Sequence, residues 1–180
     1  MLENKFSRRN ALSWLAASGA ATAVLVGTQT KAKAINTPKI VDAWIDAFYI
    51  AKDPEAFAAL YTDNGLFEDI PNGFQIKGAN NIKCFVKGTL QLFSNFKIDI
   101  ISTFTGENKA VAEYLFTATN TGLIPVPSTL GKSFTVRTVT IFDLKGNKVE
   151  RSSDYYDNNA ILVQLGLAPA PPAAQPPSCQ

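Results

Sequence analysis

The sequence contains no histidine, only two cysteines and a single methionine among its 180 residues. The lack of histidine excludes Ser-His-Asp and Cys-His catalysis and every zinc site that needs a histidine ligand. Cys84 and Cys179 lie far apart and form no C-x-x-C pair, and two cysteines are too few for a cysteine-only structural zinc site. The sequence therefore predicts neither a metal site nor a bound cofactor. Any chemistry would depend on carboxylates, amides and phenols.

The first 34 residues have the layout of an export signal. A short basic start with Arg8 and Arg9 precedes an uncharged, alanine-rich stretch over 14–27, and a small-x-small site follows at 32–34. The apolar run is about 14 residues long, whereas a stable membrane span needs roughly 20. The paired arginines favour a twin-arginine signal, although Ala11 stands where phenylalanine is usual. A Sec signal or an uncleaved anchor remains the alternative.

Loss of this leader would change the net charge of the protein. The whole chain carries 17 basic and 15 acidic residues, and five of the basic and one of the acidic residues lie before Ile35. The mature chain would therefore be slightly acidic, which disfavours binding to nucleic acid. Export places it in a periplasm or a thylakoid lumen, where Cys84 and Cys179 either pair or stay separate thiols. We expect Cys84 to face the core.

The end of the chain is rich in proline and alanine. Five prolines lie between Ala168 and Gln180, and such a density allows neither helix nor sheet. The predicted organisation is therefore a signal peptide over 1–34, one folded domain over 35–167 and an extended or disordered tail over 168–180.

The first half of the folded domain predicts three helices. Thr37-Pro38 is a helix start signal, and apolar residues recur at three- and four-residue steps from Ile40 to Phe48. Asp53-Pro54 starts a second, short helix that ends near Leu60. A third helix with its own apolar stripe is predicted from about Asn80 to Phe93.

Strands are predicted elsewhere. Leu66–Ile70 is expected as a short strand between turns at 64–65 and 71–73. From residue 96 the hydrophobic period changes to two, which predicts an antiparallel meander of four strands with a hairpin turn at 145–147. A short helix over 158–165 closes the domain. The expected fold class is α+β, with a curved antiparallel sheet wrapped on the three N-terminal helices and a pocket at its open end.

Four local patterns then carry a family resemblance. They are YTDNGLFED at 61–69, ATNTG at 118–122, Gly131-Lys132 ahead of a strand, and GNKV at 146–149 followed by DYYD at 154–157 and QLG at 164–166. In this order they resemble the SnoaL-like polyketide-cyclase and ester-cyclase group of the nuclear-transport-factor-two-like superfamily, over about 37–167. The resemblance implies a cone-shaped α+β fold and a homodimer through the sheet face. It implies diverse functions: cyclases, isomerases, epoxide hydrolases, dehydratases and non-enzymatic binders.

Asp154 and Asn120 are the two candidate catalytic residues. The resemblance implies a pocket carboxylate at Asp154, the acid/base of an intramolecular aldol closure in cyclases, and burial would raise its pKa. Alternatively Asp154 caps the next helix or pairs with Arg137 or Arg151. Asn120 stands where the family pattern often has histidine, and it could orient a carbonyl or enolate oxygen. Asn120 could equally be a turn residue that closes its strand.

The remaining pocket residues are predicted from strand alternation and from the covering helices. Asp69 is expected to point inward and Glu68 to be solvated, and the Arg-x-Asp pair of related epoxide hydrolases is missing at 113–116. The loop over 122–130 is either a lid or a static connection. Each aromatic residue of the pocket could also be ordinary core. The predicted ligand pocket consists of Trp44, Phe48, Tyr49, Tyr61, Asp69, Tyr114, Phe116 and Tyr156.

These features lead to one principal hypothesis and two alternatives. The principal one is an exported protein with a pocket for a small, mostly apolar organic molecule; as an enzyme it would carry out cofactor-free cyclisation or isomerisation, with Asp154 moving the proton and Asn120 steadying oxygen charge. The second is a non-catalytic carrier of an apolar ligand such as a terpenoid or pigment. The third is a dimeric interaction domain that uses the open sheet face, with a filled interior.

Overall fold

The computed structural model describes residues 38–172 of the chain. The predicted export signal, the helix cap Thr37 and Cys179 lie outside the described residues. The helices are α1 (Lys39–Ile45), the π-helix η1 (Asp46–Ile50), α2 (Pro54–Ala59), α3 (Ala79–Leu92), the 3₁₀ turn η2 (Pro127–Thr129) and α4 (Asn158–Leu165). The strands are β1 (Tyr61–Asp69), β2 (Phe74–Lys77), β3 (Phe93–Thr105), β4 (Lys109–Asn120), β5 (Ser133–Lys145) and β6 (Lys148–Tyr156).

The six strands form one curved sheet in the order β2-β1-β6-β5-β4-β3. The α+β class is confirmed, and the predicted meander corresponds to β3 through β6. Two features were not predicted. The short strand β2 pairs with β1, and β1 pairs with β6 in parallel, whereas the other neighbours are antiparallel. The parallel pair joins the first and last strands and sets Asp69 opposite Asp154.

Strand β1 contains an irregularity where a turn was expected. The predicted turn at Asn64-Gly65 is wrong, because both residues lie inside β1. The register between β1 and β6 shifts between Tyr61 and Leu66, which marks a bulge. A Cβ atom at Gly65 would lie 2.9 Å from the Cβ of Tyr61. Glycine is therefore required here by close packing within the strand.

Local capping signals fix the helix ends. The Asp53 side chain accepts hydrogen bonds from the backbone N–H groups of Glu55 (2.9 Å) and Ala56 (3.0 Å), as expected for the start of α2. Asp157 caps α4 by accepting from the Ala160 N–H at 3.0 Å. Gly166 ends α4 in the left-handed conformation, with φ of 80°.

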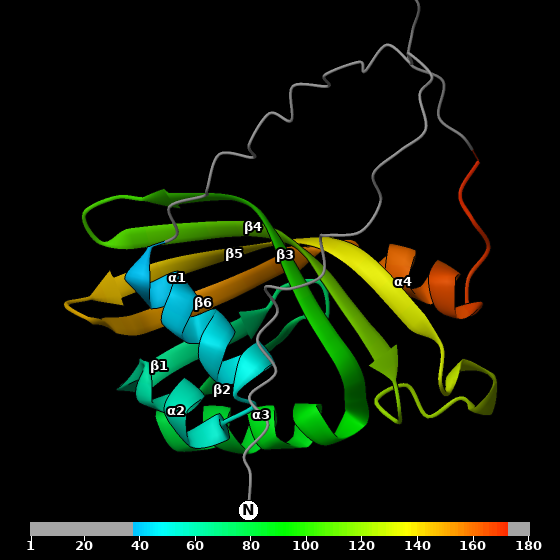
Figure 1. Ribbon diagram of the computed structural model, residues 1–180, viewed down its shortest axis with the longest axis horizontal. Coiled ribbons are helices and arrows are strands. Elements are labelled where there is room, and N and C mark those ends of the chain that lie inside the picture. Colours follow the sequence, from blue (N-terminus) through cyan, green and yellow to red (C-terminus); the bar gives the residue numbers. More distant parts are fainter. Residues whose placement is uncertain (1–37, 173–180) are drawn as a thin grey trace, which may run out of the picture. The chain divides into compact units, whose positions relative to one another are not determined.

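Helices α1, α2 and α3 lie along one side of the sheet, and α4 packs near β5 (Figure 1). Trp44 is 2% exposed and packs its ring against five other aromatic rings between these helices and the sheet. On α3, Ile82 and Val86 face this core, whereas Cys84 is exposed, so the prediction that Cys84 faces the core is wrong. No helix within residues 38–172 is long and apolar enough to cross a membrane.

Candidate active site

A cavity of about 470 Å³ lies between the helices and the concave face of the sheet. Its floor is formed by fully buried aromatic side chains such as Trp44 and Phe57, and its rim by exposed residues such as Asn72, Phe74 and Leu123. Asp154 lines this cavity, and so do seven of the eight predicted pocket residues: Trp44, Phe48, Tyr49, Asp69, Tyr114, Phe116 and Tyr156.

Strand register brings the polar groups of the cavity together. Asp69 of β1, Asp154 of β6 and Thr140 of β5 lie opposite one another in a row across three strands. In the next row, Tyr156 of β6 and Tyr114 of β4 lie on either side of a second threonine of β5, Thr138. Because side chains alternate along a strand, both rows point to the same face. Sequence reasoning missed the two threonines, although alternation along β5 could have identified them.

The carboxyl group of Asp154 faces the cavity and has a raised pKa. It accepts a hydrogen bond from Thr140 Oγ1 at 2.7 Å. Burial raises the pKa of Asp154 to about 7, the charge of Asp69 adds to this rise, and the hydrogen bond from Thr140 opposes it. The residue is half-buried because part of its surface faces the cavity; the protein atoms around its carboxyl group still remove most of its hydration.

The alternative roles considered for Asp154 do not hold. Asp157 supplies the side-chain cap of α4. Arg137 pairs with Glu113, and Arg151 pairs with Asp143 and Glu68. Asp154 is thus held by a hydroxyl group rather than by an arginine.

The buried Tyr114 extends the hydrogen bonding behind Asp154. Because the Thr140 hydroxyl donates to Asp154, the Tyr114 hydroxyl, 2.9 Å away, is the donor to Thr140. Burial raises the pKa of Tyr114 and of the neighbouring Tyr49 well above the usual value for tyrosine. Both phenols therefore remain protonated at neutral pH.

Asp69 lies nearer the rim and is held by several donors. Its carboxylate accepts from the Tyr156 hydroxyl at 2.9 and 3.0 Å, from Asn72 Nδ2 at 3.0 Å and from the Asn72 backbone N–H at 3.2 Å. Asn72 is in turn oriented by Asn158, whose Nδ2 donates to Asn72 Oδ1 at 3.0 Å. The inward position predicted for Asp69 agrees with this arrangement.

Glu68 occupies the opposite face of β1, and the prediction that it is solvated is wrong. It is 7% exposed. Its carboxylate accepts from Ser153 Oγ at 2.5 Å and from Gln75 Nε2 at 2.8 Å, and it lies 3.5 Å from the Arg151 guanidinium. The flanking strands β2 and β6 provide these side chains, so a residue that points away from the cavity is still covered.

Asn120 does not reach the cavity, contrary to the prediction. It is fully buried at the end of β4. Its Nδ2 donates to the Ile124 carbonyl and to Thr129 Oγ1, both at 2.9 Å, and its Oδ1 accepts from the backbone N–H groups of Ile124 (3.1 Å) and Gly122 (3.3 Å). All of its polar atoms are used inside the loop that follows β4. Asn120 therefore closes its strand, and the predicted role at a substrate oxygen is not compatible with this placement.

The hydrogen bonds of Asn120 also hold the loop over 122–130, for which a lid was one of the two predicted roles. Leu123 and Ile124 of this loop line the cavity, and Leu123 is 45% exposed. Thr129 Oγ1 holds the loop from the other side through the Val126 carbonyl at 2.7 Å. In this structure the loop is an anchored part of the rim.

Tyr61 is the one predicted pocket residue that does not line the cavity. Its ring is 2% exposed and packs on Phe57, and its hydroxyl is 2.7 Å from Ser152 Oγ. The alternative reading of Tyr61 as core holds. Within residues 38–172, no three His, Cys, Asp or Glu side chains are grouped so that they could hold a metal ion.

Solved structures with similar folds come from several bacteria. A hypothetical protein with a ketosteroid isomerase-like fold from Catenulispora acidiphila, solved in complex with trimethylamine, has a TM-score of 0.63 and 24% identity, over 73% of this chain and 95% of that one. A candidate polyketide cyclase from Pseudomonas putida has a TM-score of 0.62 and 22% identity, over 69% and 94%. A candidate SnoaL-like polyketide cyclase from Shewanella denitrificans has a TM-score of 0.63 and 18% identity, over 71% and 94%.

At these identities the solved structures establish the fold alone. A search of curated proteins gives no match. The profile of the SnoaL-like polyketide cyclase family, however, matches residues 39–165, which is well over half of the chain. The match contains every helix and strand from α1 to α4, and with them all the cavity residues described above. The chain therefore belongs to the SnoaL-like polyketide cyclase family.

Proposed function

We propose that this protein is a cofactor-independent acid/base enzyme that cyclises or isomerises a small, mostly apolar carbonyl compound in the cavity. One observation carries the proposal: Asp154, whose carboxyl pKa is raised to about 7, faces an apolar cavity and is oriented by Thr140. A group with a pKa near the working pH is both a competent base and a competent acid. Asp154 provides this property in a chain without histidine.

The proposed reaction begins with the Asp154 carboxylate. It takes a proton from the carbon next to the substrate carbonyl, and the electrons of that C–H bond form the enolate. In a cyclisation the enolate carbon then forms a bond to a second carbonyl carbon of the same molecule, and Asp154 returns its proton to the new alkoxide. In an isomerisation Asp154 returns the proton to a different carbon.

The oxygen charge that develops in the enolate needs a hydrogen-bond donor. Asn120 was predicted for this role and is occupied within its loop. We assign the role to Thr138 instead. This residue lies beside Thr140 on the cavity face of β5, and its buried Oγ1 has no hydrogen-bond partner among the described residues.

The test measures proton abstraction directly. A panel of small cyclic ketones is incubated with the protein in D₂O, and loss of the α-proton signals is followed by NMR. We expect wild-type protein to accelerate exchange and Asp154→Asn to lower the rate about 10²- to 10⁴-fold. Asp143→Asn, the same change on the outer face of β5, should leave the rate unchanged. Equal exchange rates for Asp154→Asn and wild type would overturn the assignment.

A second candidate function is a non-catalytic carrier of an apolar molecule. The observation that favours it is the sequestered amide of Asn120, which stands at a position where the family pattern often has histidine. A carrier would bind members of the ketone panel but would not accelerate their exchange in D₂O. Binding without exchange by the wild-type protein would therefore decide for the carrier.

We also propose that the mature domain is exported to a periplasm or thylakoid lumen and forms a homodimer through the outer face of its sheet. The leader pattern over 1–34 supports export. Tyr155, which is 43% exposed on that outer face, supports an interface there. Native mass spectrometry of protein purified from its own compartment would report the cleavage site, the subunit number and any bound molecule. An uncleaved monomer would contradict both parts.

A further inference from the structure

We propose that the cavity selects ligands that carry a positively charged nitrogen, which Asp69 and Asp154 hold among aromatic rings. This inference rests on the proposed use of the same cavity and names its ligand class. It does not depend on proton transfer by Asp154, because a cationic ligand could be bound with or without being converted.

The charges of the lining residues favour a cationic ligand. The 24 lining residues include two carboxyl groups and not one lysine or arginine. Arg151 of β6 lies on the outer face of the sheet, where it is paired with Asp143 and Glu68. An anionic ligand would find no counter-ion in this lining, whereas a cationic ligand would find two.

The cavity lining is also rich in aromatic rings. Twelve of the 24 lining residues are Phe, Tyr or Trp. The faces of aromatic rings attract cations, and desolvation strengthens this attraction. Asp69 stands among such rings: Phe74 is its partner across the β1–β2 pair, Phe67 precedes it on the same face, and Phe85 packs against both phenylalanines. A carboxylate surrounded by rings is the arrangement that binds an alkylammonium group.

The two carboxyl groups of the lining come from paired positions in the sheet. Asp69 and Asp154 are opposite each other on neighbouring strands, about 4.8 Å apart in the backbone. Charge repulsion from Asp69 contributes to the raised pKa of Asp154. One cation placed between the two side chains would relieve this repulsion and favour the anionic form of Asp154.

The cavity lining also contains a hydroxyl group that has no hydrogen-bond partner among the described residues. Thr138 is 4% exposed and lines the cavity, and its Oγ1 has no partner in the described part of the chain. It lies between Tyr156 and Tyr114 in the strand register, one row from Asp154. A buried hydroxyl without a partner is costly, so a polar group of a ligand beside the cation would complete the site.

The test uses three probes of nearly equal shape and different charge. Phenyltrimethylammonium, tert-butylbenzene and benzenesulfonate each join a phenyl ring to a tetrahedral head group with charge +1, 0 and −1. A Trp14→Phe background leaves Trp44, in the cavity, as the only tryptophan to report binding by fluorescence. We expect phenyltrimethylammonium to bind at least about tenfold more tightly than tert-butylbenzene, and benzenesulfonate not to bind.

Two variants locate the charge selection. Asp69→Asn should reduce the preference for phenyltrimethylammonium over tert-butylbenzene about tenfold. Asp63→Asn is the matched control, since it makes the same change at an exposed position of the same strand. Affinity for tert-butylbenzene measures, within each variant, whether the cavity remains intact.

The pH dependence gives an independent readout, because phenyltrimethylammonium does not titrate. The groups that influence Asp154 are Asp69, Thr140 and the neutral phenols of Tyr49, Tyr61, Tyr114 and Tyr156, and none of these carries a positive charge. Affinity for the ammonium probe should therefore rise at least about tenfold from pH 5.5 to pH 8.5, as Asp154 loses its proton. Affinity for tert-butylbenzene should stay constant.

The outcomes separate this inference from the proposed function. If tert-butylbenzene binds as tightly as the ammonium probe, or benzenesulfonate binds better, the charge selection is overturned while the cavity remains a binding site. If none of the three probes binds, the proposed use of the cavity is overturned as well. Preference for the ammonium probe without any ketone exchange would support the cationic ligand class and contradict the acid/base assignment.

Discussion

Aspartate carboxyl groups on the two faces of the sheet have pKa values shifted in opposite directions. On the outer face, Asp143 of β5 accepts hydrogen bonds from Lys109 and Arg151, and these cations lower its pKa. On the cavity face, Asp154 of the adjacent strand has only a hydroxyl partner, and burial raises its pKa to about 7. The two residues have the same side chain and lie on paired strands. Their neighbours alone decide whether the carboxyl group is a fixed anion or a titrating acid.

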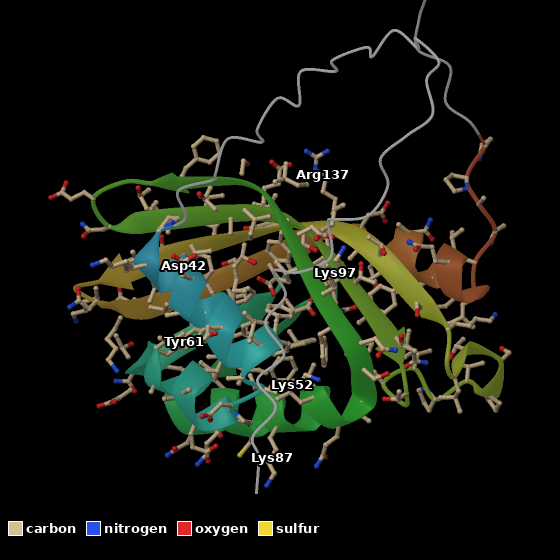
Figure 2. The ribbon with its side chains drawn as sticks, viewed as in Figure 1. Asp42, Lys52, Tyr61, Lys87, Lys97 and Arg137 are labelled. Carbon is tan, nitrogen blue, oxygen red and sulfur yellow. The ribbon has the colours of Figure 1, made fainter. Side chains whose placement is uncertain are left out.

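Glu113 is a second carboxylate on the outer face that is paired with a cation. Arg137 pairs with Glu113 at 2.5 Å, and hydrogen bonds from Ser102 and Arg137 lower the pKa of Glu113. Figure 2 shows Arg137 on the side of the sheet away from helices α1 to α3. Basic side chains are thus placed where they stabilise carboxylates and are kept out of the cavity lining. Because of this separation no basic side chain lowers the pKa of Asp154.

Of the changes considered on the two faces, removing the charge of Asp154 should have the largest effect on stability. The native state holds the Asp154 proton more tightly than the unfolded chain, so stability falls as the pH rises from about 4 to about 7. Above that window the ionised group costs about 4 kcal/mol. Asp154→Asn should therefore raise the free energy of unfolding by about this amount at pH 8 and have little effect at pH 4, as measured by urea unfolding.

The urea slope checks that the two proteins unfold in the same way. Asparagine keeps a carbonyl oxygen that can accept the hydrogen bond from Thr140. A loss of stability at pH 8, with an unchanged dependence on urea, would show that Asp154 is stabilised as an anion and would remove the contrast between the two faces.

Much of the fold follows from local signals in the sequence. The cap formed by Asp53 begins α2, and the alternation of β5 and the glycine turn at Gly146 give the β5–β6 hairpin. The parallel pairing of β1 with β6 was not predicted, because it depends on two segments about 85 residues apart meeting at their edges. The four residues of β2 were too few to show a pattern.

Only part of the site was predicted, because the residues that reach the cavity are also decided by contacts between segments far apart in the sequence. Alternation along β4 assigned Tyr114, Phe116 and Asn120 to one face, but alternation does not say where along the strand the cavity ends. The loop after β4 folds back over Asn120 and uses its amide. Alternation also directed Glu68 away from the cavity, yet Arg151 of β6, a strand far along the sequence but paired with β1, covers it there. Depth and cover depend on tertiary packing, which the period of a single strand does not contain.

A smaller effect is expected on the outer face. Asp143→Asn removes a carboxylate whose pKa is lowered in the folded protein. Its contribution to stability is therefore present at neutral pH, and it is lost as the pH falls from the pKa of the unfolded group through the lower folded pKa. Because the partners are largely exposed, the loss at pH 7 should be about 1 kcal/mol, and smaller in 1 M salt. Thermal unfolding at two salt concentrations would measure it. An effect as large as that of Asp154→Asn, or of the same sign, would refute the comparison.

The smallest effect is expected within the cavity face itself, between two threonines of β5. The Thr140 hydroxyl bridges Tyr114 and Asp154, whereas Thr138 Oγ1 has no partner in the described chain. Thr138→Val should change the free energy of unfolding by about 0.5 kcal/mol or less, while Thr140→Val should lower it by about 1–2 kcal/mol because it leaves two buried groups unpaired. If Thr138 instead serves the ligand, Thr138→Val should slow ketone exchange in D₂O in a protein of unchanged stability. A large loss of stability in Thr138→Val would mean that its hydroxyl is structural, and the enolate would then need another donor.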